Sequence, residues 1–523
     1  MSPTRERAWE ELGAGVFDVL VIGGGIIGSR VAFDAARYGL RVALVDAGDF
    51  GGATSGASAR LVHGGLRYLG KGGLRLVRAA LRERDILATR IAPHLVRPQP
   101  FLLSVAGGKR ELSRCAAGLL LYTALGGFRG PLPRLVTPEE AAFLVPPLRA
   151  DSLGSHAIFQ EATTDDSRLT LATVTAAART GAVVANYLRV VDLDPGTISR
   201  VTLEGPEGTL VVLCRAVVNA TGPWVDRVRK MEDPRCGPIA RLSKGIHVVL
   251  GPEEPWRAAV AVSLEDGNHL YAVPSEGKVL LGTTDEEYEG DPGSVAADPA
   301  AVSHLLRTSH RFLDQGMLRE ERVVSAFAGL RVLPRENGET LDASRDHLLS
   351  VGAGGMVSVA GGKLTTHRRI ALDVLRNLPV TVRPRRLRLG NDPLPGASSS
   401  RTLDVHFRTD ASTADLLFRH YGGEAGALLA YREKLPNATD RITAGAPDIW
   451  AQVYHAIREE WAVTAEDVIH RRTTLGRRGL DSPEIRRTIS ACLDVGPVVL
   501  QGCADLRRTL PSRGTFGNAP LSC

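Results

Sequence analysis

Cysteine is scarce in this sequence, and no two cysteines are spaced for joint chemistry. The 523 residues contain six cysteines, and none of them forms a C-x-x-C pair. Neither a metal site nor a redox dithiol is therefore predicted, and we expect no bound metal. Scattered cysteines in a long chain are typical of a reducing cytoplasm, so a cytoplasmic location is expected.

Long apolar runs and aromatic residues are also missing. No stretch reaches the roughly 18 apolar residues of a membrane-spanning helix, and residues 1–15 are charged without an apolar core, which does not fit a secretory signal. Aromatic residues make up only 5% of the chain and do not interleave with basic runs, so no nucleic-acid partner is expected. The net charge of +6 favours an anionic substrate or an anionic membrane surface instead.

The composition is otherwise that of a soluble globular protein. Apolar residues make up 44% of the chain and charged residues 23%. The length exceeds what one compact core supports, so two or three domains are expected. Residues 242–284 are β-rich, residues 378–400 contain four prolines and three consecutive serines, and residues 402–495 have a helical pattern.

The stretch that follows residue 16 carries a dinucleotide-binding pattern. A buried strand at 17–22 runs into Gly23, Gly25 and Gly28, which are spaced as G-x-G-x-x-G and precede a predicted helix. Asp46 ends the next predicted strand, at the spacing of a carboxylate that holds a ribose hydroxyl. The pattern indicates a dinucleotide but does not distinguish NAD from FAD.

Residues 51–59 are small and rich in hydroxyl groups. Such a segment allows backbone and hydroxyls to lie against a ligand, although a flexible loop has the same composition. Two later small-residue turns, at 220–222 and 361–363, favour FAD over NAD because an extended FAD is wrapped by several strand ends.

Two helical segments bear on membrane contact. Residues 74–92 predict a basic amphipathic helix that ends near Pro93. Residues 112–125 are apolar with one charge, Arg114, and predict either a buried helix or an interfacial helix lying on an anionic membrane.

Several motifs together carry a family resemblance. The chain resembles the FAD-dependent, aerobic-type glycerol-3-phosphate dehydrogenases of the D-amino-acid-oxidase-like flavoprotein superfamily. The motifs are Gly-Gly-Gly-Ile-Ile-Gly (23–28), Ala-Thr-Ser to His-Gly-Gly-Leu-Arg-Tyr-Leu (53–69), Val-Asn-Ala-Thr-Gly-Pro-Trp (218–224), Lys-Gly-Ile-His (244–247), Gly-Thr-Thr-Asp (282–285) and Ala-Gly-Gly-Lys-Leu-Thr-Thr (360–366). The C-terminal part, with Ile442–Asp448 and Glu466–Thr473, is similar to the helical cap domain of that family.

The resemblance implies an α/β fold: a Rossmann-like FAD-binding domain, a β-rich antiparallel substrate domain and a C-terminal all-helical cap domain. The domain boundaries expected are an extension (1–16), FAD-binding parts (about 17–105, 157–225 and 340–380), substrate parts (about 106–156 and 226–339), a linker (381–400) and a helical domain (401–523). The last 20 or so residues show no periodicity.

The resemblance also implies a set of FAD-binding positions. They are Gly23, Gly25, Ile26, Ile27, Gly28, Asp46, Ala47, Thr54, Ser55, Ser58, His63, Gly64, Gly65, Ala220, Thr221, Gly222, Gly361, Gly362, Lys363, Leu364 and Thr365. The N-terminus of the helix after Gly362, with Lys363, would stabilise the negative charge that the flavin gains on reduction.

A phosphate-bearing substrate needs cationic ligands. The resemblance indicates Arg67, Arg331 and Lys363, with Tyr68 as a hydroxyl donor, because guanidinium groups bind phosphate through paired hydrogen bonds. Arg331 and Lys363 are expected to act in catalysis as well as in binding. Each of these residues could also be an ordinary surface cation.

Oxidation of an alcohol requires a proton acceptor, and histidine is the usual choice. His247 in Lys-Gly-Ile-His is the first candidate, and His63 the second, although His63 is expected to lie against the flavin. The plain alternative is that His247 is a strand histidine satisfied by a neighbour.

Three positions depart from the family pattern. Ile27 replaces a frequent Asn, Val332 interrupts an Arg-Pro-Leu sequence, and His470 replaces a common aromatic residue. None of these changes removes an expected charged group.

The resemblance implies oxidation of sn-glycerol 3-phosphate to dihydroxyacetone phosphate, with hydride transfer to flavin N5 and electrons passed to a quinone. An oxidase that uses oxygen, and an amine or amino-acid oxidase, are the alternatives. The enzyme is expected to contact the cytoplasmic membrane peripherally, and a homodimer is left open.

Overall fold

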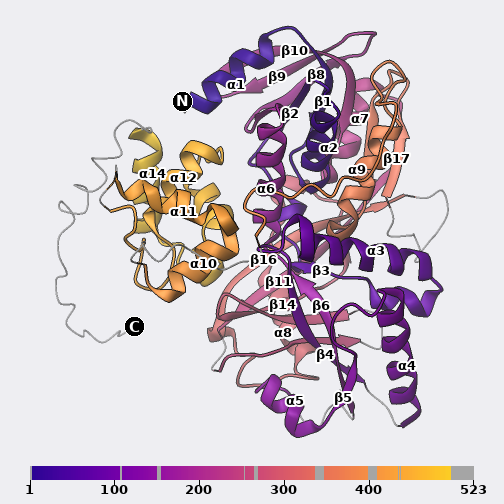
Figure 1. The fold of residues 1–523 in the computed structure, drawn as a ribbon, viewed down its shortest axis with the longest axis vertical. Coiled ribbons are helices and arrows are strands. Elements are labelled where there is room, and N and C mark those ends of the chain that lie inside the picture. The colour runs from indigo at the N-terminus through magenta and orange to yellow at the C-terminus, as the bar shows by residue number, and fades with distance from the viewer. Residues whose placement is uncertain are drawn as a thin grey trace.

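The computed structural model describes residues 3–105, 109–149, 155–251, 254–263, 269–335, 347–398, 409–433, 435 and 437–495. Figure 1 shows one sheet with its helices in the upper part of the molecule, a second sheet below it, and the C-terminal helices to one side. The predicted fold class is confirmed: an α/β dinucleotide-binding unit, a β-rich unit and an all-helical C-terminal unit.

The first sheet is centred on β1 (Val16–Ile22), as the apolar run at 17–22 predicts. Its described strand order is β17-β18-β10-β1-β2-β7, and β18, β10, β1, β2 and β7 are parallel. Residues 19–22 of β1 are buried, which is typical of a parallel strand covered on both faces. The other strands are β2 (Val42–Val45), β7 (Val183–Ala185), β8 (Arg189–Asp194), β9 (Ser199–Gly205), β10 (Gly208–Asn219), β17 (His347–Val351) and β18 (Val357–Gly361).

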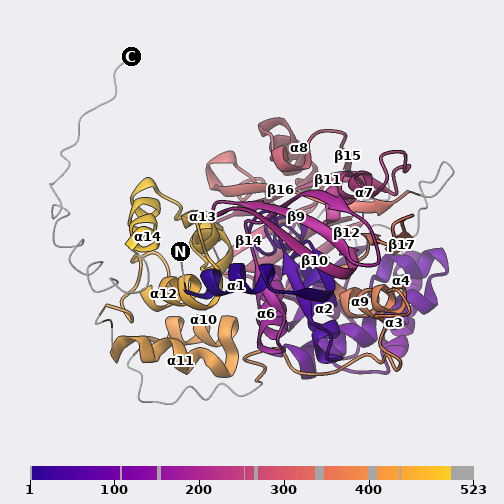
Figure 2. The ribbon, with the colours of Figure 1, turned by 90° about the horizontal axis from the view of Figure 1, so that it is seen from above.

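Helices cover both faces of this sheet. On one face α2 (Ile26–Arg37), α6 (Asp166–Arg179) and α9 (His367–Arg376) share one apolar core. On the other, α1 (Pro3–Gly13) and α7 (Val225–Glu232) pack with the β8–β9 hairpin. Figure 2 shows α1 running beside the C-terminal helix α12, which it contacts.

The second sheet is mostly antiparallel, with the described order β15-β11-β14-β13-β12-β4-β6-β3 and with β16 and β5 added to β11 and β6. Its strands are β3 (Leu61–Val62), β4 (Arg97–Val105), β5 (Arg134–Val136), β6 (Ser155–Thr163), β11 (Ala240–Leu250), β12 (Ala259–Ser263), β13 (His269–Ser275), β14 (Lys278–Gly282), β15 (Glu286–Glu287) and β16 (Val323–Pro334). Residues 97–105 and 155–163 both lie in this sheet, where β4 pairs with β6.

Helices also flank the second sheet. α5 (Pro138–Leu144) and α8 (Pro299–Ser309) pack against one face, and α3 (Leu74–Ile86) and α4 (Lys109–Leu125) against the other. The predicted helix at 74–92 is divided, because α3 is followed by a π-helical turn at Leu87–Ile91. α4 buries Leu119 and Tyr122 and exposes Leu120 and Leu121, so it is neither a fully buried helix nor a detached one.

The C-terminal unit has its own apolar core, which joins Leu417, Ala425, Tyr454, Val468 and Ile489 among others. Its helices are α10 (Ala411–Tyr421), α11 (Ala425–Leu429), α12 (Trp450–Glu459), α13 (Ala465–Asp467) and α14 (Pro483–Val495), with a π-helical turn at Val468–Arg472. Residues 381–398 of the predicted linker hold no helix or strand, and 399–400 lie outside the described residues, as do 401–408 and 496–523.

Candidate active site

The turn between β1 and α2 requires glycine at two positions. Gly23 has a φ of +103°, and a Cβ there would lie 2.5 Å from the Ala220 carbonyl oxygen. A Cβ on Gly28 would lie 1.9 Å from the Gly23 carbonyl oxygen. Gly25, at the N-cap of α2, supplies no capping side chain. The glycines therefore bring backbone and helix N-terminus to the sheet edge, where a pyrophosphate would bind.

Asp46 lies at the end of β2 and closes onto that turn. Its Oδ2 accepts a hydrogen bond from the Gly24 N–H at 2.6 Å, and its Oδ1 accepts one from the Gly48 N–H at 2.9 Å. Burial raises the pKa of Asp46 to about 6, although these two N–H groups act in the opposite direction. The carboxylate is placed where a ribose would meet the turn. Ala47, which was predicted beside it, is exposed.

Three turns that are far apart in sequence meet at the same sheet edge. Gly23 approaches both Ala220 and Thr221, at the end of β10. A Cβ on Gly362, at φ +95°, would lie 3.3 Å from Cδ1 of Ile27 in the first turn of α2. The carboxyl ends of parallel strands gather at one edge. The edge thus offers the several backbone turns that an extended FAD needs, and the residues present fit this cofactor.

The hydroxyl-rich loop after β2 spans the two sheets. Ser55 Oγ accepts a hydrogen bond from the Ile26 N–H at 3.0 Å, which ties the loop to the start of α2. The Thr54 hydroxyl donates to the Leu330 carbonyl at 2.7 Å, on β16 of the second sheet. The Ser58 hydroxyl donates to a buried carboxylate of α6 at 2.8 Å. The loop is therefore anchored at three points and is not a free linker.

The next segment is packed against the turn after β18. Thr365 is buried. Its hydroxyl accepts a hydrogen bond from the backbone N–H of His63 and donates one to the His63 carbonyl, both at 3.2 Å. A Cβ on Gly64 would lie 2.3 Å from the Tyr122 hydroxyl, and Gly65 has a φ of +76°. Thr365 thus holds His63 in place through the backbone.

One face of the second sheet fronts the hydroxyl-rich loop. Gly245 on β11 is opposite Gly329 on β16, and Ser243 is opposite Arg331. A Cβ on Gly329 would lie 2.2 Å from the Ala57 carbonyl oxygen, so the loop lies directly on this face. Successive side chains of a strand point to opposite faces of the sheet. Ile246, the residue after Gly245, therefore points away from the loop and joins the core on the opposite face.

Arg331 is fixed on this face by its neighbours. Its Nη2 donates to the Thr283 hydroxyl at 2.8 Å and to the Thr284 carbonyl at 2.9 Å, and its Nη1 donates to Asp285 at 3.0 Å. The Gly-Thr-Thr-Asp motif (282–285) therefore orients this guanidinium. Val332 follows it in β16, and the strand continues to Pro334 without interruption.

His247 is buried on the same face. Its ring stacks on Phe327 at 5.1 Å between centroids, and a Cβ on Gly282 would lie 2.4 Å from the ring. Neither ring nitrogen has a hydrogen-bond partner in the part of the chain that the structure describes. Burial, followed by the charges of Arg331 and Arg60, lowers the pKa of His247 to about 3. The imidazole is therefore neutral at neutral pH.

The missing partners of His247 favour a functional role. A buried polar atom is nearly always hydrogen-bonded, and an exception calls for an explanation such as a bound ligand. The plain alternative, a strand histidine satisfied by a neighbour, is not what the described residues show.

Tyr68 and Lys363 come together although 295 residues separate them. The Lys363 Nζ lies 3.8 Å from the centroid of the Tyr68 ring, a cation–π contact that joins the 3-10 turn at Leu66–Lys71 to the end of β18. The side chain of Arg67, in the same turn, lies outside the described residues, so its predicted role stays a prediction.

Arg60 was not identified from the sequence. It is buried, has a φ of +57°, and donates from Nη1 to the Ser275 hydroxyl at 3.1 Å. Burial lowers its pKa to about 10. Its charge acts on His247, so it belongs to the same surroundings. No spacing distinguishes Arg60 among the 64 lysines and arginines. Its position directly after the hydroxyl-rich loop is the one signal in the sequence that could have identified it.

One cluster of described residues has metal-ligating side chains, namely Glu466, His470 and Asp481. Arg486 donates to both carboxylates, and His470 Nε2 lies 2.9 Å from Asp481. The arginine supplies the positive charge that a metal ion would bring. His470, the third departure from the family pattern, thus takes part in a charge network.

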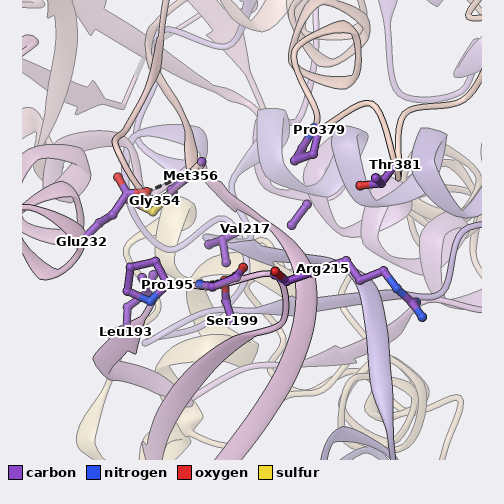
Figure 3. Close-up of a pocket in the computed structure, with 14 residues that line it drawn as sticks. Leu193, Pro195, Ser199, Arg215, Val217, Glu232, Gly354, Met356, Pro379 and Thr381 are labelled. Atoms are coloured by element: carbon purple, nitrogen blue, oxygen red, sulfur yellow. Dashed lines mark hydrogen bonds between the residues drawn. The ribbon is translucent and has the colours of Figure 1, made fainter.

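A separate cavity of about 160 Å³ opens near the amino end of β18, and Figure 3 shows the residues that line it. Pro195 and Ser199, at the β8–β9 turn, and Glu232, at the end of α7, lie around it. The glycine turns lie at the carboxyl ends of the same strands, so this cavity is distinct from the predicted cofactor site.

Comparisons with known proteins agree with this architecture. Residues 18–368 match the family model of FAD-dependent oxidoreductases, and residues 390–490 match that of the C-terminal domain of alpha-glycerophosphate oxidase. The chain is 34% identical to a glycerol-3-phosphate dehydrogenase of Mycobacterium leprae, over 95% of this chain and 86% of that protein. It is 32% identical to one from Synechocystis sp., over 90% of each chain.

A solved structure covers almost the whole molecule. The glycerol-3-phosphate dehydrogenase from Bacillus halodurans, complexed with FAD, superposes with a TM-score of 0.75 at 25% identity and covers 96% of both chains. With the glycine turns, the hydroxyl-rich loop and the helical C-terminal unit all in place, the chain belongs to the glycerol-3-phosphate dehydrogenase family of FAD-dependent oxidoreductases.

Proposed function

We propose that this protein oxidises sn-glycerol 3-phosphate to dihydroxyacetone phosphate and passes the electrons to a membrane quinone. The observation that supports the proposal is the buried, neutral His247 on the same sheet face as Arg331. This face lies against the hydroxyl-rich loop. FAD, when bound, supplies the acceptor for the hydride that leaves the substrate carbon.

Arg331 and Lys363 would bind the substrate phosphate. Arg331 is held on the sheet face by Thr283 and Asp285, so its direction is set before substrate arrives. Lys363 adds a second cation at the end of β18, beside the Tyr68 ring. We also assign Arg67 and the Tyr68 hydroxyl to the phosphate. Two or more cations match the double negative charge of a phosphate better than they match the single negative charge of an amino-acid carboxylate.

His247 would accept the proton of the substrate hydroxyl. Its ring is neutral at neutral pH, and no described neighbour occupies either nitrogen. Burial is the main cause of the lowered pKa of His247, and the charges of Arg331 and Arg60 lower it further; a bound dianionic phosphate near Arg331 would offset these charges. The imidazole would therefore become a stronger base when the substrate is present.

The test is turnover of the FAD-loaded protein with different acceptors. Glycerol 3-phosphate should be oxidised rapidly with a soluble quinone analogue and slowly with oxygen alone. Rapid peroxide release without quinone would establish the oxidase alternative. Residues 390–490 match a family model that is described from an oxidase, which is why this alternative is tested. Turnover with an amine or amino acid, and none with glycerol 3-phosphate, would overturn the proposal.

We further propose that the enzyme contacts an anionic cytoplasmic membrane through residues 110–143. Six large apolar side chains are exposed in this segment: Leu120 (50%), Leu121 (46%), Phe128 (60%), Leu132 (60%), Leu135 (50%) and Phe143 (61%). The exposed arginines Arg110, Arg114 and Arg129 lie among them. The segment forms α4, β5 and α5 in the lower part of Figure 1. None of the helices in the described ranges is long and apolar enough to cross a bilayer.

Vesicle sedimentation tests this surface. Wild-type protein should bind vesicles that contain anionic phospholipid, and a Leu120→Ser/Leu121→Ser variant should bind much less. Val380→Ser is the matched control, because Val380 is 79% exposed but lies outside the segment. Equal binding by all three proteins would contradict the assignment.

A further inference from the structure

The C-terminal unit contacts the loop that carries Asp46. Asp49, three residues after Asp46, is buried, and its Oδ1 accepts from Arg472 Nη2 at 2.8 Å and from Asn186 Nδ2 at 3.2 Å. Its Oδ2 accepts from Arg472 Nη1 and from Arg471 Nε. Two consecutive arginines of the C-terminal unit therefore hold one carboxylate of the dinucleotide-binding unit.

These groups are fixed on the C-terminal side as well. Arg472 is fully buried and also donates from Nη2 to the Glu460 carbonyl at 2.6 Å. Asn186 donates to the Trp461 carbonyl at 2.7 Å. Burying an ion pair contributes little net stability, because desolvation offsets the attraction. What such a pair does provide is a defined position for the loop.

Apolar packing continues this contact as far as the glycine turn. The rings of Phe50 and Trp461 meet edge to face at 5.7 Å between centroids. A Cβ on Gly24 would lie 2.3 Å from Phe50, and the Gly51 N–H donates to the Gly24 carbonyl at 3.1 Å. Residues 46–52 thus lie between the glycine turn on one side and residues 460–472 on the other.

We propose that Trp461, Arg471 and Arg472 of the C-terminal unit are positioning residues for FAD, because they hold the loop at 46–52 against the turn that receives the adenosine half. The C-terminal unit is then part of the cofactor-binding apparatus, although it supplies none of the glycine-rich motifs. This inference rests on FAD being the cofactor, and it does not depend on the electron acceptor.

The charge of Arg471 supports this assignment. Burial and the charge of Asp49 raise the pKa of Asp46, and the charge of Arg471 acts in the opposite direction, toward the ionised carboxylate. An ionised carboxylate can accept hydrogen bonds from both ribose hydroxyls, whereas the protonated form loses one acceptor.

A second contact of the C-terminal unit provides a matched comparison. Arg419 donates to Glu276 at 3.0 and 3.1 Å, at the turn between β13 and β14 of the second sheet. Like the Arg472 pair, this one is largely buried and joins the same unit to the rest of the chain. It does not touch residues 46–52. Loss of either pair weakens docking, but only loss of the Arg472 pair should affect FAD.

The experiment measures FAD release and rebinding by flavin fluorescence on the full chain, for wild type, Arg472→Met, Trp461→Leu and Arg419→Met. Arg472→Met and Trp461→Leu should each weaken FAD affinity by about tenfold or more, which equals roughly 1.4 kcal/mol. Arg419→Met should stay within about twofold of wild type. ADP, which carries the adenosine ribose, should compete with FAD for wild type, and the dissociation constant of ADP, corrected for the FAD affinity of each protein, should be about tenfold higher for Arg472→Met.

Two results would overturn the proposal. One is FAD and ADP affinity unchanged in both Arg472→Met and Trp461→Leu. The other is an equal loss of FAD affinity in Arg419→Met, which would show a general effect of docking. Trp461→Leu removes no charge, so it decides the question if Arg472→Met does not fold. A failure of quinone turnover leaves these affinities unaffected, so the two proposals fail separately.

Discussion

The two sheets contribute to the site in different ways. The first sheet uses its edge, where Gly23, Gly28 and Gly362 bring backbone and a helix N-terminus together. The second uses its face, where His247 and Arg331 present side chains toward the hydroxyl-rich loop. A sheet edge offers backbone N–H groups that can hold phosphates of any dinucleotide, whereas a face offers side chains that select a substrate. The edge should therefore determine cofactor affinity, and the face should determine turnover.

The largest expected effect comes from breaking the edge. Gly28→Val puts a Cβ 1.9 Å from the Gly23 carbonyl oxygen. This oxygen belongs to the backbone, so it cannot move aside as the end of a flexible side chain could. We expect FAD to be lost almost completely, because roughly 3 kcal/mol or more of strain corresponds to a weakening of about 100-fold or more. Bound flavin per chain, read from absorbance after purification, is the measurement. Gly118→Ala, where a Cβ meets nothing within 4 Å, should keep its flavin.

A substitution on the face of the second sheet should leave FAD bound. His247→Asn removes the proton acceptor, and we expect kcat/KM for glycerol 3-phosphate to fall by about 1,000-fold, within the range for loss of a general base. Bound FAD should stay at the wild-type level. Steady-state kinetics with a quinone analogue, corrected for flavin content, measures the change. His304→Asn, at an exposed position on α8, is the control. A parallel loss of flavin in His247→Asn would show that His247 is structural.

Arg331→Met tests the substrate side of the same face. Loss of a charge-assisted phosphate contact costs roughly 3 kcal/mol, so kcat/KM should fall by about 100-fold, mainly through KM. Flavin content should again be unchanged. The exposed Arg307 on α8 provides the control variant Arg307→Met. A changed kcat with an unchanged KM would remove Arg331 from the phosphate site.

The smallest expected effect is a pH dependence of FAD affinity, which arises from Asp46 at the edge of the first sheet. The pKa of Asp46 is about 6 in the free protein, and ribose binding needs the ionised form. FAD affinity should be nearly constant above pH 7 and should fall by up to about fourfold between pH 7 and pH 5.5. Because the folded-state pKa is raised, the contribution of this group to apoprotein stability is lost as pH rises through about 6. FAD titrations of wild type and Asp46→Asn check this, and the variant should show no such fall.

The edge could be predicted closely from the sequence, because local steric rules determine it. The run at 17–22, the glycine spacing and Asp46 lie within about thirty residues, and all of them occupy the expected places. The face was predicted only through resemblance. Nothing local in the sequence shows that His247 and Arg331 share a face, since their relative placement depends on strand register over 84 residues.

Some features could not be predicted because they depend on contacts between units. Arg60 looks like any surface arginine until its burial beside Ser275 is known. Likewise, Asp49 and Arg472 are more than 400 residues apart, and although Arg472 lies in the Glu466–Thr473 stretch, nothing local in the sequence indicates that it pairs with Asp49. The pairing of β4 and β6 in the second sheet also depends on long-range contacts.

Anaerobic reduction of bound flavin tests most directly whether the edge holds the cofactor and the face performs the chemistry. Glycerol 3-phosphate should bleach the flavin absorbance of the wild-type protein rapidly. The His247→Asn variant, loaded with the same amount of FAD, should bleach about 1,000-fold more slowly. No bleaching of the wild type, or equal rates in the two proteins, would contradict the account.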